Sequence, residues 1–304
     1  MNWSFIRKVG YGPWAIRTVQ RQVRKRLLHG GCTMTLPTGV EFFVPPHSHI
    51  GGEVFLTDAD VDWGAEALLA RLVPRELIFL DIGANIGYYS AYMHPLVAAV
   101  HAFEPDGRAL PYLHSLAARL PRLTVHAAAV SHADGTALLA SGSSSEISTL
   151  ATEPGKGIEV PTVAIDSFAS KFGGTVGAIK VDTEGHESQV LAGAERAIDR
   201  DRPLLLCETA VDGSLLAWAA ARRYRAGAPV ELPGERLAFR WFDRPATLPT
   251  KMVFLVPEDR APALEAAAQE LYGDGLPYRA YRPRLRAFRR ATRLVAARAT
   301  SIAS

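Results

Sequence analysis

The chain has 304 residues, 48% of them hydrophobic, which is enough for one sizeable hydrophobic core. It contains no run of about 18 uncharged apolar residues, and its first residues lack the apolar segment and cleavage site of a secretory signal, so we expect neither a membrane-spanning nor a secreted protein. The two cysteines, Cys32 and Cys207, form no CxxC pair, so we expect no disulfide framework, no zinc knuckle and a cytoplasmic location.

Basic residues are concentrated at the two ends of the chain. Residues 1–40 carry seven lysines and arginines and no acid, and residues 275–304 carry eight arginines and no acid. All 31 acidic residues therefore lie between 41 and 274, where they outnumber the remaining 19 basic residues. This distribution predicts an acidic body with basic ends.

The middle of the chain alternates short apolar runs with helical patterns. Strands are predicted over 77–80, 97–103, 123–130, 176–181, 203–207 and 252–256; helices are predicted within 86–95 and over 107–120, 165–172, 187–199 and 214–224. Asp134-Gly135 indicates a hairpin, and the small polar residues 141–149 indicate a surface loop. The alternation predicts an α/β fold with a doubly wound, mostly parallel, Rossmann-like sheet and helices on both faces. Ligands of such sheets bind beyond the carboxyl ends of the strands.

Four acidic residues directly follow predicted strands: Asp81, Glu104, Asp182 and Glu208. In this topology all four would crowd one edge of the sheet. Like charges there are unfavourable unless a cation, hydroxyl groups or backbone amides share them.

The stretch DIGANIG, residues 81–87, follows the first of these strands and indicates a ligand-binding turn. Gly83 and Gly87 leave room for a ligand near the backbone, and the next helix begins with free N–H groups. The loop lacks the middle glycine of the dinucleotide fingerprint, and an acid before it suits a ligand with an ammonium and a sulfonium. Glu104 could accept hydrogen bonds from two ribose hydroxyls, in an NAD or an S-adenosylmethionine site. The loop favours the methyl donor, and an NAD-linked oxidoreductase is the weakest alternative.

Four segments together resemble the FkbM-type S-adenosylmethionine-dependent methyltransferases: DIGANIGYYS (81–90), FEPD (103–106), VAIDSF (163–168) and IKVDTEGHE (179–187). The resemblance covers roughly residues 50–210, and Thr183 stands where the family more often has an aliphatic residue; we expect it to face away from the ligand. It implies a class I methyltransferase that methylates hydroxyls of sugars, polyketides or related small molecules. We expect three parts: a basic N-terminal arm (1–50), the methyltransferase domain (51–260) and a basic C-terminal helical extension (261–304).

The resemblance also suggests the site residues. The predicted contacts to S-adenosylmethionine are Asp81, Gly83, Asn85, Gly87, Glu104, Ala129, Val130 and Asp182. A hydroxyl acceptor needs a base, and His186, Asp182 and Glu184 are the candidate catalytic residues. We favour His186, because an imidazole titrates near neutral pH; Asp182 would orient a hydroxyl or the methionine end of the donor, and Glu184 could instead cap a helix. Glu208 is expected to be structural. No metal is expected, because the carboxylates lack a diagnostic spacing.

Both ends of the chain have the pattern of basic amphipathic helices. Ile16, Val19, Val23 and Leu27 would share one face near the start, and Leu285, Phe288, Thr292 and Val295 another near the end. Such helices could contact an anionic membrane, bind nucleic acid, or pack on the acidic body or a second subunit. Two other functions stay open. One is a nucleic-acid methyltransferase, although the fourth strand does not end in an Asn/Asp-Pro-Pro-aromatic turn; the other is a non-catalytic nucleotide-binding partner subunit.

Overall fold

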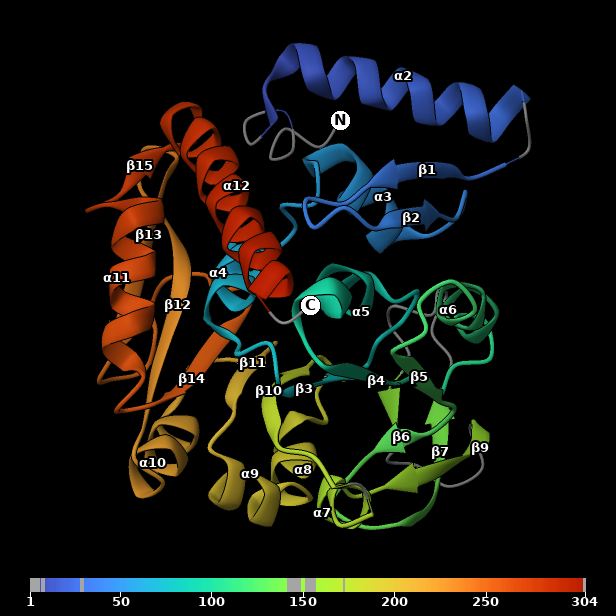
Figure 1. The fold of residues 1–304 in the computed structure, drawn as a ribbon, viewed down its shortest axis with the longest axis vertical. Coiled ribbons are helices and arrows are strands. Elements are labelled where there is room, and N and C mark those ends of the chain that lie inside the picture. Colours follow the sequence, from blue (N-terminus) through green and yellow to red (C-terminus); the bar gives the residue numbers. More distant parts are fainter. Residues whose placement is uncertain are drawn as a thin grey trace.

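A nine-stranded sheet forms the centre of the computed structural model, which describes residues 6, 9–27, 30–140, 149–150, 157–171 and 173–302 (Figure 1). Five strands are parallel to their neighbours, in the order β11 (Leu204–Cys207), β10 (Val176–Val181), β3 (Ile78–Ile82), β4 (Ala99–Phe103) and β5 (Leu123–His126). Four antiparallel strands continue beyond β11, in the order β14 (Val253–Pro257), β12 (Tyr224–Leu232), β13 (Arg236–Phe242) and β15 (Leu276–Pro277). The α/β, doubly wound prediction is confirmed, and the sheet as a whole is mixed.

Helices cover both faces of this sheet. One face carries α4 (Ala65–Leu72), α5 (Tyr88–Met93), the short η1 (His94–Leu96), α6 (Leu110–Ala117), α11 (Ala261–Tyr272) and α12 (Tyr278–Ile302); the other carries α7 (Ile165–Ala169), α8 (Glu187–Ala192), α9 (Glu195–Asp201) and α10 (Gly213–Ala221). Alternation along β3 divides the core, because Phe79 packs under the first layer while Leu80 and Ile82 pack under the second. Asp81 therefore points to the same face as Phe79, towards α5. The helix predicted over 187–199 is divided into α8 and α9.

A small second sheet lies beside β5 (Figure 1). Its order is β6 (Ala129–Val130), β9 (Ile158–Val163), β7 (Gly135–Ala140) and β8 (Thr149–Leu150). The predicted hairpin at Asp134-Gly135 is wrong, because β9 lies between β6 and β7 and pairs with both. The strand predicted over 123–130 is likewise two strands, one in each sheet. The loop predicted over 141–149 lies outside the described residues, apart from its last residue in β8.

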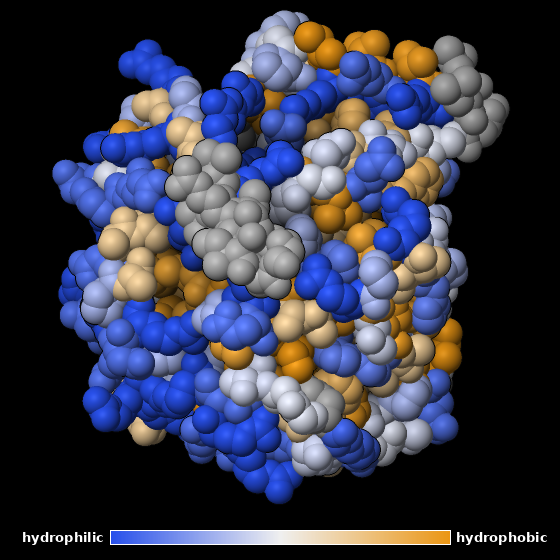
Figure 2. Space-filling view, viewed as in Figure 1, coloured by the Kyte–Doolittle hydropathy of each residue, from blue (hydrophilic) through white to orange (hydrophobic). Residues whose placement is uncertain are grey.

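The N-terminal part lies above the first helical layer. Helix α2 (Tyr11–Leu27) contacts α3 (His49–Thr57), and β1 (Cys32–Thr35) pairs with β2 (Glu41–Val44). Hydrophobic residues gather along the outer edge of the molecule where α2 lies (Figure 2). Cys32 and Cys207 are both buried and free. Among the described residues, no helix combines the length and the apolar character needed to cross a membrane.

The C-terminal part packs into the core. Strand β15 pairs with β13, and α12 contacts both α4 and α11. Three residues of the predicted stripe of α12 are buried, with Leu285 4%, Phe288 2% and Thr292 8% exposed; the side chain of Val295 lies outside the described ones. The sequence left several alternatives open for the basic ends. In the structure, α12 packs on the body of the protein. The segment predicted as an extension, 261–304, therefore shares the core of the main sheet.

Candidate functional site

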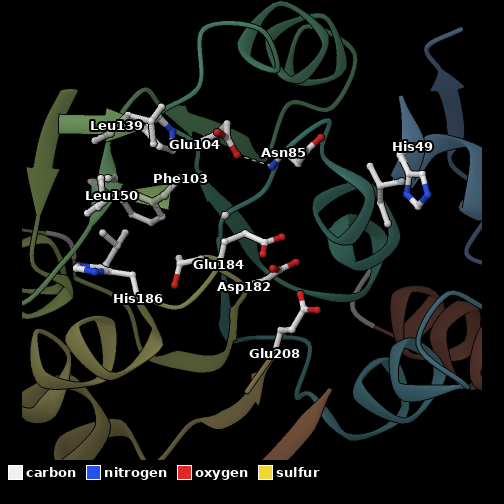
Figure 3. Close-up of a pocket in the computed structure, with 17 residues that line it drawn as sticks. His49, Asn85, Phe103, Glu104, Leu139, Leu150, Asp182, Glu184, His186 and Glu208 are labelled. Carbon is white, nitrogen blue, oxygen red and sulfur yellow. Dashed lines mark hydrogen bonds between the residues drawn. The ribbon is translucent and has the colours of Figure 1, made fainter. Parts of the chain in front are cut away.

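The carboxyl ends of β3, β4 and β10 form one wall of a cleft with a volume of about 250 Å³, here called the main cleft (Figure 3). It brings together most of the residues predicted from the sequence, namely Gly83, Asn85, Glu104, Ala129, Val130, Asp182, Glu184 and His186. It also contains residues that were not predicted as ligand contacts, namely His49, Ile50, Phe103, Pro105, Ala128, Leu139, Leu150, Thr183 and Glu208. Thr183 is among these residues, but its hydroxyl donates to Oε1 of Glu187 (3.0 Å), which is not a lining residue, so its facing away from the ligand stays a prediction.

Two predicted ligand contacts, Asp81 and Gly87, do not line the main cleft. Asp81 lies within β3 instead of following it, and its side chain is fully buried against α5. The hydroxyl of Ser90 donates to Asp81 Oδ2 (2.6 Å), and burial raises the pKa of this carboxyl. Asp81 therefore supports the site from beneath.

Gly83 allows two strands to approach each other. Its φ is +70°, and a Cβ at this position would lie 1.7 Å from the carbonyl oxygen of Asp182. Gly87, with φ +86°, allows α6 to pack on the start of α5, since a Cβ there would lie 2.7 Å from the side chains of Leu113 and Leu116. Close packing of the protein around the loop thus requires both glycines. The sequence alone had suggested a different reason for them, namely space for a ligand.

Glu104 is fixed by backbone donors. Its Oε2 accepts from the amide of Asn85 (2.7 Å), as Figure 3 shows, and its Oε1 accepts from the amide of Asp106 (2.8 Å). The residue is 5% exposed, and burial raises the pKa of its carboxyl to about 7. A carboxylate oxygen has two lone pairs, so each oxygen can accept one more hydrogen bond at the cleft. Apolar side chains lie near it in the cleft: Phe103, Val130, Leu139 and Leu150.

Lys180 lies beside the site and was not singled out by the sequence analysis. It stands in parallel register with Asp81, and its Nζ lies 3.7 Å from Asp81 Oδ1 and 3.1 Å from Asp182 Oδ2. The same ammonium donates to the carbonyl of Gly83 (2.8 Å) and is 3% exposed. Burial acts to raise the pKa of Asp182, but the charge of Lys180 and the hydrogen bonds with Glu208 and Lys180 together lower this pKa. A lysine inside an apolar strand, two residues before an acid, was the available signal.

Asp182, Glu184 and Glu208 form an acidic cluster, in which carboxylate oxygens lie within 4.8 Å of one another. Desolvation in the cleft and a hydrogen bond with Asp182 raise the pKa of Glu208 to about 9. Desolvation and the charge of Asp182 also raise the pKa of Glu184. Near neutral pH the Asp182–Glu208 pair therefore holds one proton. The cluster is compact enough to hold a cation, but Lys180 and this shared proton already offset part of its charge.

His186 lies apart from this cluster, across the main cleft in Figure 3. Its Nε2 is 2.9 Å from the hydroxyl oxygen of Ser131, which is itself buried. Burial lowers the pKa of His186. The structure therefore separates the three residues predicted as catalytic into two groups, with Asp182 and Glu184 on one side and His186 on the other.

A smaller side cavity of about 160 Å³ adjoins the main cleft and shares Gly83, Asn85, Asp182 and Glu208 with it. Its far wall is polar. The ammonium of Lys251 donates to Glu53 Oε1 (2.9 Å), and the hydroxyl of Tyr89 donates to Asp62 Oδ2 (2.7 Å). Here α3, the 58–64 loop and β14 meet the end of β10.

Comparison with known proteins identifies a family that matches the part of the chain that forms most of the main cleft. Residues 81–224 match the family described as Methyltransferase FkbM domain. No curated protein matches the chain. Among solved structures, methyltransferase FkbM from Methylobacillus flagellatus KT is similar at 19% identity and a TM-score of 0.41, covering 67% of this chain and 52% of that one. This chain thus spans about half the length of that protein.

Two further solved structures are similar at lower identity. One is the precorrin-6y C5,15-methyltransferase from Geobacter metallireducens GS-15, with 12% identity, a TM-score of 0.36, and coverage of 66% of this chain and 88% of that one. The other is an rRNA methylase from Streptococcus thermophilus, with 13% identity, a TM-score of 0.38, and coverage of 64% and 93%. Likenesses this remote carry no argument about the acceptor.

Proposed function

Because residues 81–224 belong to the FkbM methyltransferase family, we propose that this S-adenosylmethionine-dependent methyltransferase methylates a hydroxyl group of a small molecule or glycan. The observation that carries the hydroxyl acceptor is the Asp182–Glu208 pair at the mouth of β10 and β11. A hydroxyl, unlike a neutral amine, is a poor nucleophile until a base begins to remove its proton.

The residues that line the main cleft suit the chemistry and the charge of the donor. Glu104 would hold the ribose hydroxyls with its remaining lone pairs. Phe103, Val130 and Leu139 would contact the adenine, and His186 lies on this side of the cleft. The acidic cluster lies on the other side, where it would favour the positively charged methionine end.

The donor supplies a methyl group already activated by the sulfonium, so the protein has to position the acceptor and take its proton. We assign the proton of the acceptor to the Asp182–Glu208 pair, in which Glu208 is already protonated and the ionised Asp182 takes the second proton. Lys180, 3.1 Å away, helps to keep Asp182 ionised. His186 faces Ser131 on the adenine side, so we place it with the donor contacts. The side cavity, which shares Asp182 and Glu208 with the main cleft, is then the place for the acceptor.

Isothermal titration tests the donor site. We expect S-adenosylmethionine and S-adenosylhomocysteine to bind the wild type, and NAD not to bind. Glu104→Ala should weaken both sulfur ligands by about tenfold or more, the equivalent of losing one charge-assisted hydrogen bond. The matched control is Glu265→Ala, an exposed glutamate on α11, which should bind like the wild type.

Transfer of a labelled methyl group to candidate acceptors tests the hydroxyl assignment. Label in sugars or hydroxylated polyketides would support it. Label in RNA or DNA alone, with binding that survives about 200 mM salt, would replace it with a nucleic-acid methyltransferase. Donor binding without transfer to any of these acceptors would favour a non-catalytic subunit.

A further inference from the structure

Helix α2 presents its apolar face to solvent. Ile16 is 60%, Val19 61% and Val23 44% exposed, and their i, i+3, i+7 spacing places them on one side of the helix. Tyr11, at the start of the helix, is 72% exposed. Figure 2 shows this stripe as hydrophobic residues along the outer edge of the molecule. A contiguous exposed apolar face of this kind marks an interaction surface.

Arginines on the opposite side of α2 fix this orientation. Arg17 donates to Asp58 Oδ1 (2.6 Å) and to the carbonyl of Leu56 (3.2 Å), and Arg21 donates to the carbonyl of Ser48 (2.8 Å). Arg17 and Arg21 are four residues apart, so they share the face that meets α3. The charged face of this amphipathic helix therefore packs on the protein, and the apolar face is left outside.

The exposed face of α2 is bordered by positive charge. Arg24 and Arg26 are exposed, and none of the 17 residues of the helix is acidic. We infer that α2 attaches the protein to an anionic lipid surface, with Ile16, Val19 and Val23 entering the interface and the arginines contacting headgroups. Basic amphipathic helices bind membranes in this way, through apolar burial added to attraction for anionic lipids.

A second copy of the chain is the other occupant that an apolar helix face would suit. Pairing two α2 helices would bring their basic residues together with no acid in either helix to offset them, which disfavours it. The part of the α12 stripe that the structure describes is not available to a membrane, because Leu285 and Phe288 are buried in the core. The inference does not depend on methyl transfer, since it uses no residue of the main cleft.

Co-sedimentation of the full chain with vesicles tests the inference. We expect binding to vesicles of phosphatidylglycerol and phosphatidylcholine, and little binding to phosphatidylcholine alone. The variant Ile16→Gln/Val19→Gln/Val23→Gln should reduce the partition coefficient at least tenfold. Arg24→Gln/Arg26→Gln should reduce it about thirtyfold at low salt, or about fivefold for each charge. The matched control is Ile158→Gln on β9, whose side chain is 65% exposed, and it should bind vesicles like the wild type.

Titration with S-adenosylhomocysteine and the circular dichroism spectrum would verify that each variant is folded. The inference fails if the wild type does not bind anionic vesicles, or if the folded triple glutamine variant binds them equally well. It also fails if the wild type forms a dimer in sedimentation velocity that the triple variant abolishes, because α2 would then be a contact between copies of the chain.

Discussion

The ammonium of Lys180 lies 3.1 Å from Oδ2 of Asp182, and both residues belong to the same end of β10. Asp81 stands opposite Lys180 on β3, 3.7 Å from the same nitrogen. One buried cation thus serves a carboxylate inside the sheet and a carboxylate at the main cleft. This explains how several acids can crowd one edge of the sheet, and it links the stability of the fold to the charge of the site.

Replacing Lys180 by methionine should lower the free energy of unfolding by about 3–5 kcal/mol, the usual cost of leaving a buried charge without its partner. Asp81→Asn added to this variant should restore part of the loss, because it removes one of the two unpaired charges. Urea denaturation measures both changes. The control is Lys171→Met, since Lys171 is exposed. A loss under about 1 kcal/mol for Lys180→Met would show that the ammonium is not the partner of the two acids.

Donor affinity should rise with pH across the range around 7. Burial raises the pKa of Glu104 to about 7, so its carboxyl is protonated below that pH and loses the charge that would accept ribose hydroxyls. We expect S-adenosylhomocysteine to bind up to about tenfold more weakly at pH 6 than at pH 8, measured by titration calorimetry. Glu104→Gln should bind weakly and without this dependence. A wild-type affinity that does not change between these pH values would contradict the role of Glu104.

The contribution of Glu104 to the stability of the ligand-free protein should fall as pH rises, which is opposite to the trend in donor affinity. Because the pKa of Glu104 is raised in the folded state, its contribution is fully present below the ordinary pKa of a glutamate, near 4.5, and is lost as pH rises through about 7. Thermal unfolding of wild type and Glu104→Gln at pH 5 and 8 would measure this difference. The contributions of the other titrating groups to the pH dependence of stability cancel when the two proteins are compared.

The parallel strands could be predicted because most of them are short, largely apolar runs. β10 and β11 were predicted to within one residue at either end. β12 was not, since Gly227 and Pro229 lie inside it, and these residues are unfavourable in the middle of a strand. The small sheet was missed because β6 is two residues long and pairs with a strand that follows it by about 30 residues. A periodic pattern does not reveal such pairing.

The candidate site, like the fold, could be predicted only in part from the sequence. Glu104, Asp182 and the loop at Gly83 could be placed at one edge, because the end of a parallel strand fixes its position. The partners of Lys180 depend on the register between β3 and β10, which the sequence does not specify. The separation of His186 from Asp182 depends in the same way on the turn at Glu184, where φ is +52°.

Gly83→Ala should destabilise the protein by at least about 2 kcal/mol, because the added methyl group would overlap the carbonyl of Asp182 and force β3 and β10 apart. Donor binding should be lost with it. Gly213→Ala is the control: no described atom lies within 4 Å of the place that its methyl group would take, and alanine favours the helix that begins there. Denaturation and titration of both variants would check this. An unchanged midpoint for Gly83→Ala would show that the two strands are not held this closely.

Asp182→Asn should lower kcat on an accepted hydroxyl substrate by about 10²–10⁴, the range for loss of a positioned base. Its asparagine can keep a hydrogen bond with Glu208 but cannot take the proton of the acceptor. His186→Gln should mainly raise the KM for the donor, because His186 lies on the adenine side of the main cleft. Steady-state kinetics of the two variants separates the roles. A large fall in kcat for His186→Gln, with Asp182→Asn near wild type, would return the role of base to the histidine.

Arg289 should matter more to stability than the basic residues that α12 exposes. It is 8% exposed, and its guanidinium donates to the carbonyls of Asp58 (3.0 Å) and Ala59, two residues with positive φ in the loop that leads to the side cavity. Arg289→Met would leave both carbonyls without these donors, so we expect a loss of about 3 kcal/mol in urea denaturation.

Arg290→Met is the matched control, because the next residue of the same helix is exposed. It should change stability by less than about 0.5 kcal/mol. If the two variants were equally stable, α12 would be held to the loop by apolar packing alone. If only Arg289→Met loses stability, Arg289 fixes the wall of the side cavity while Arg290 faces solvent, although the sequence places the two side by side in one basic run.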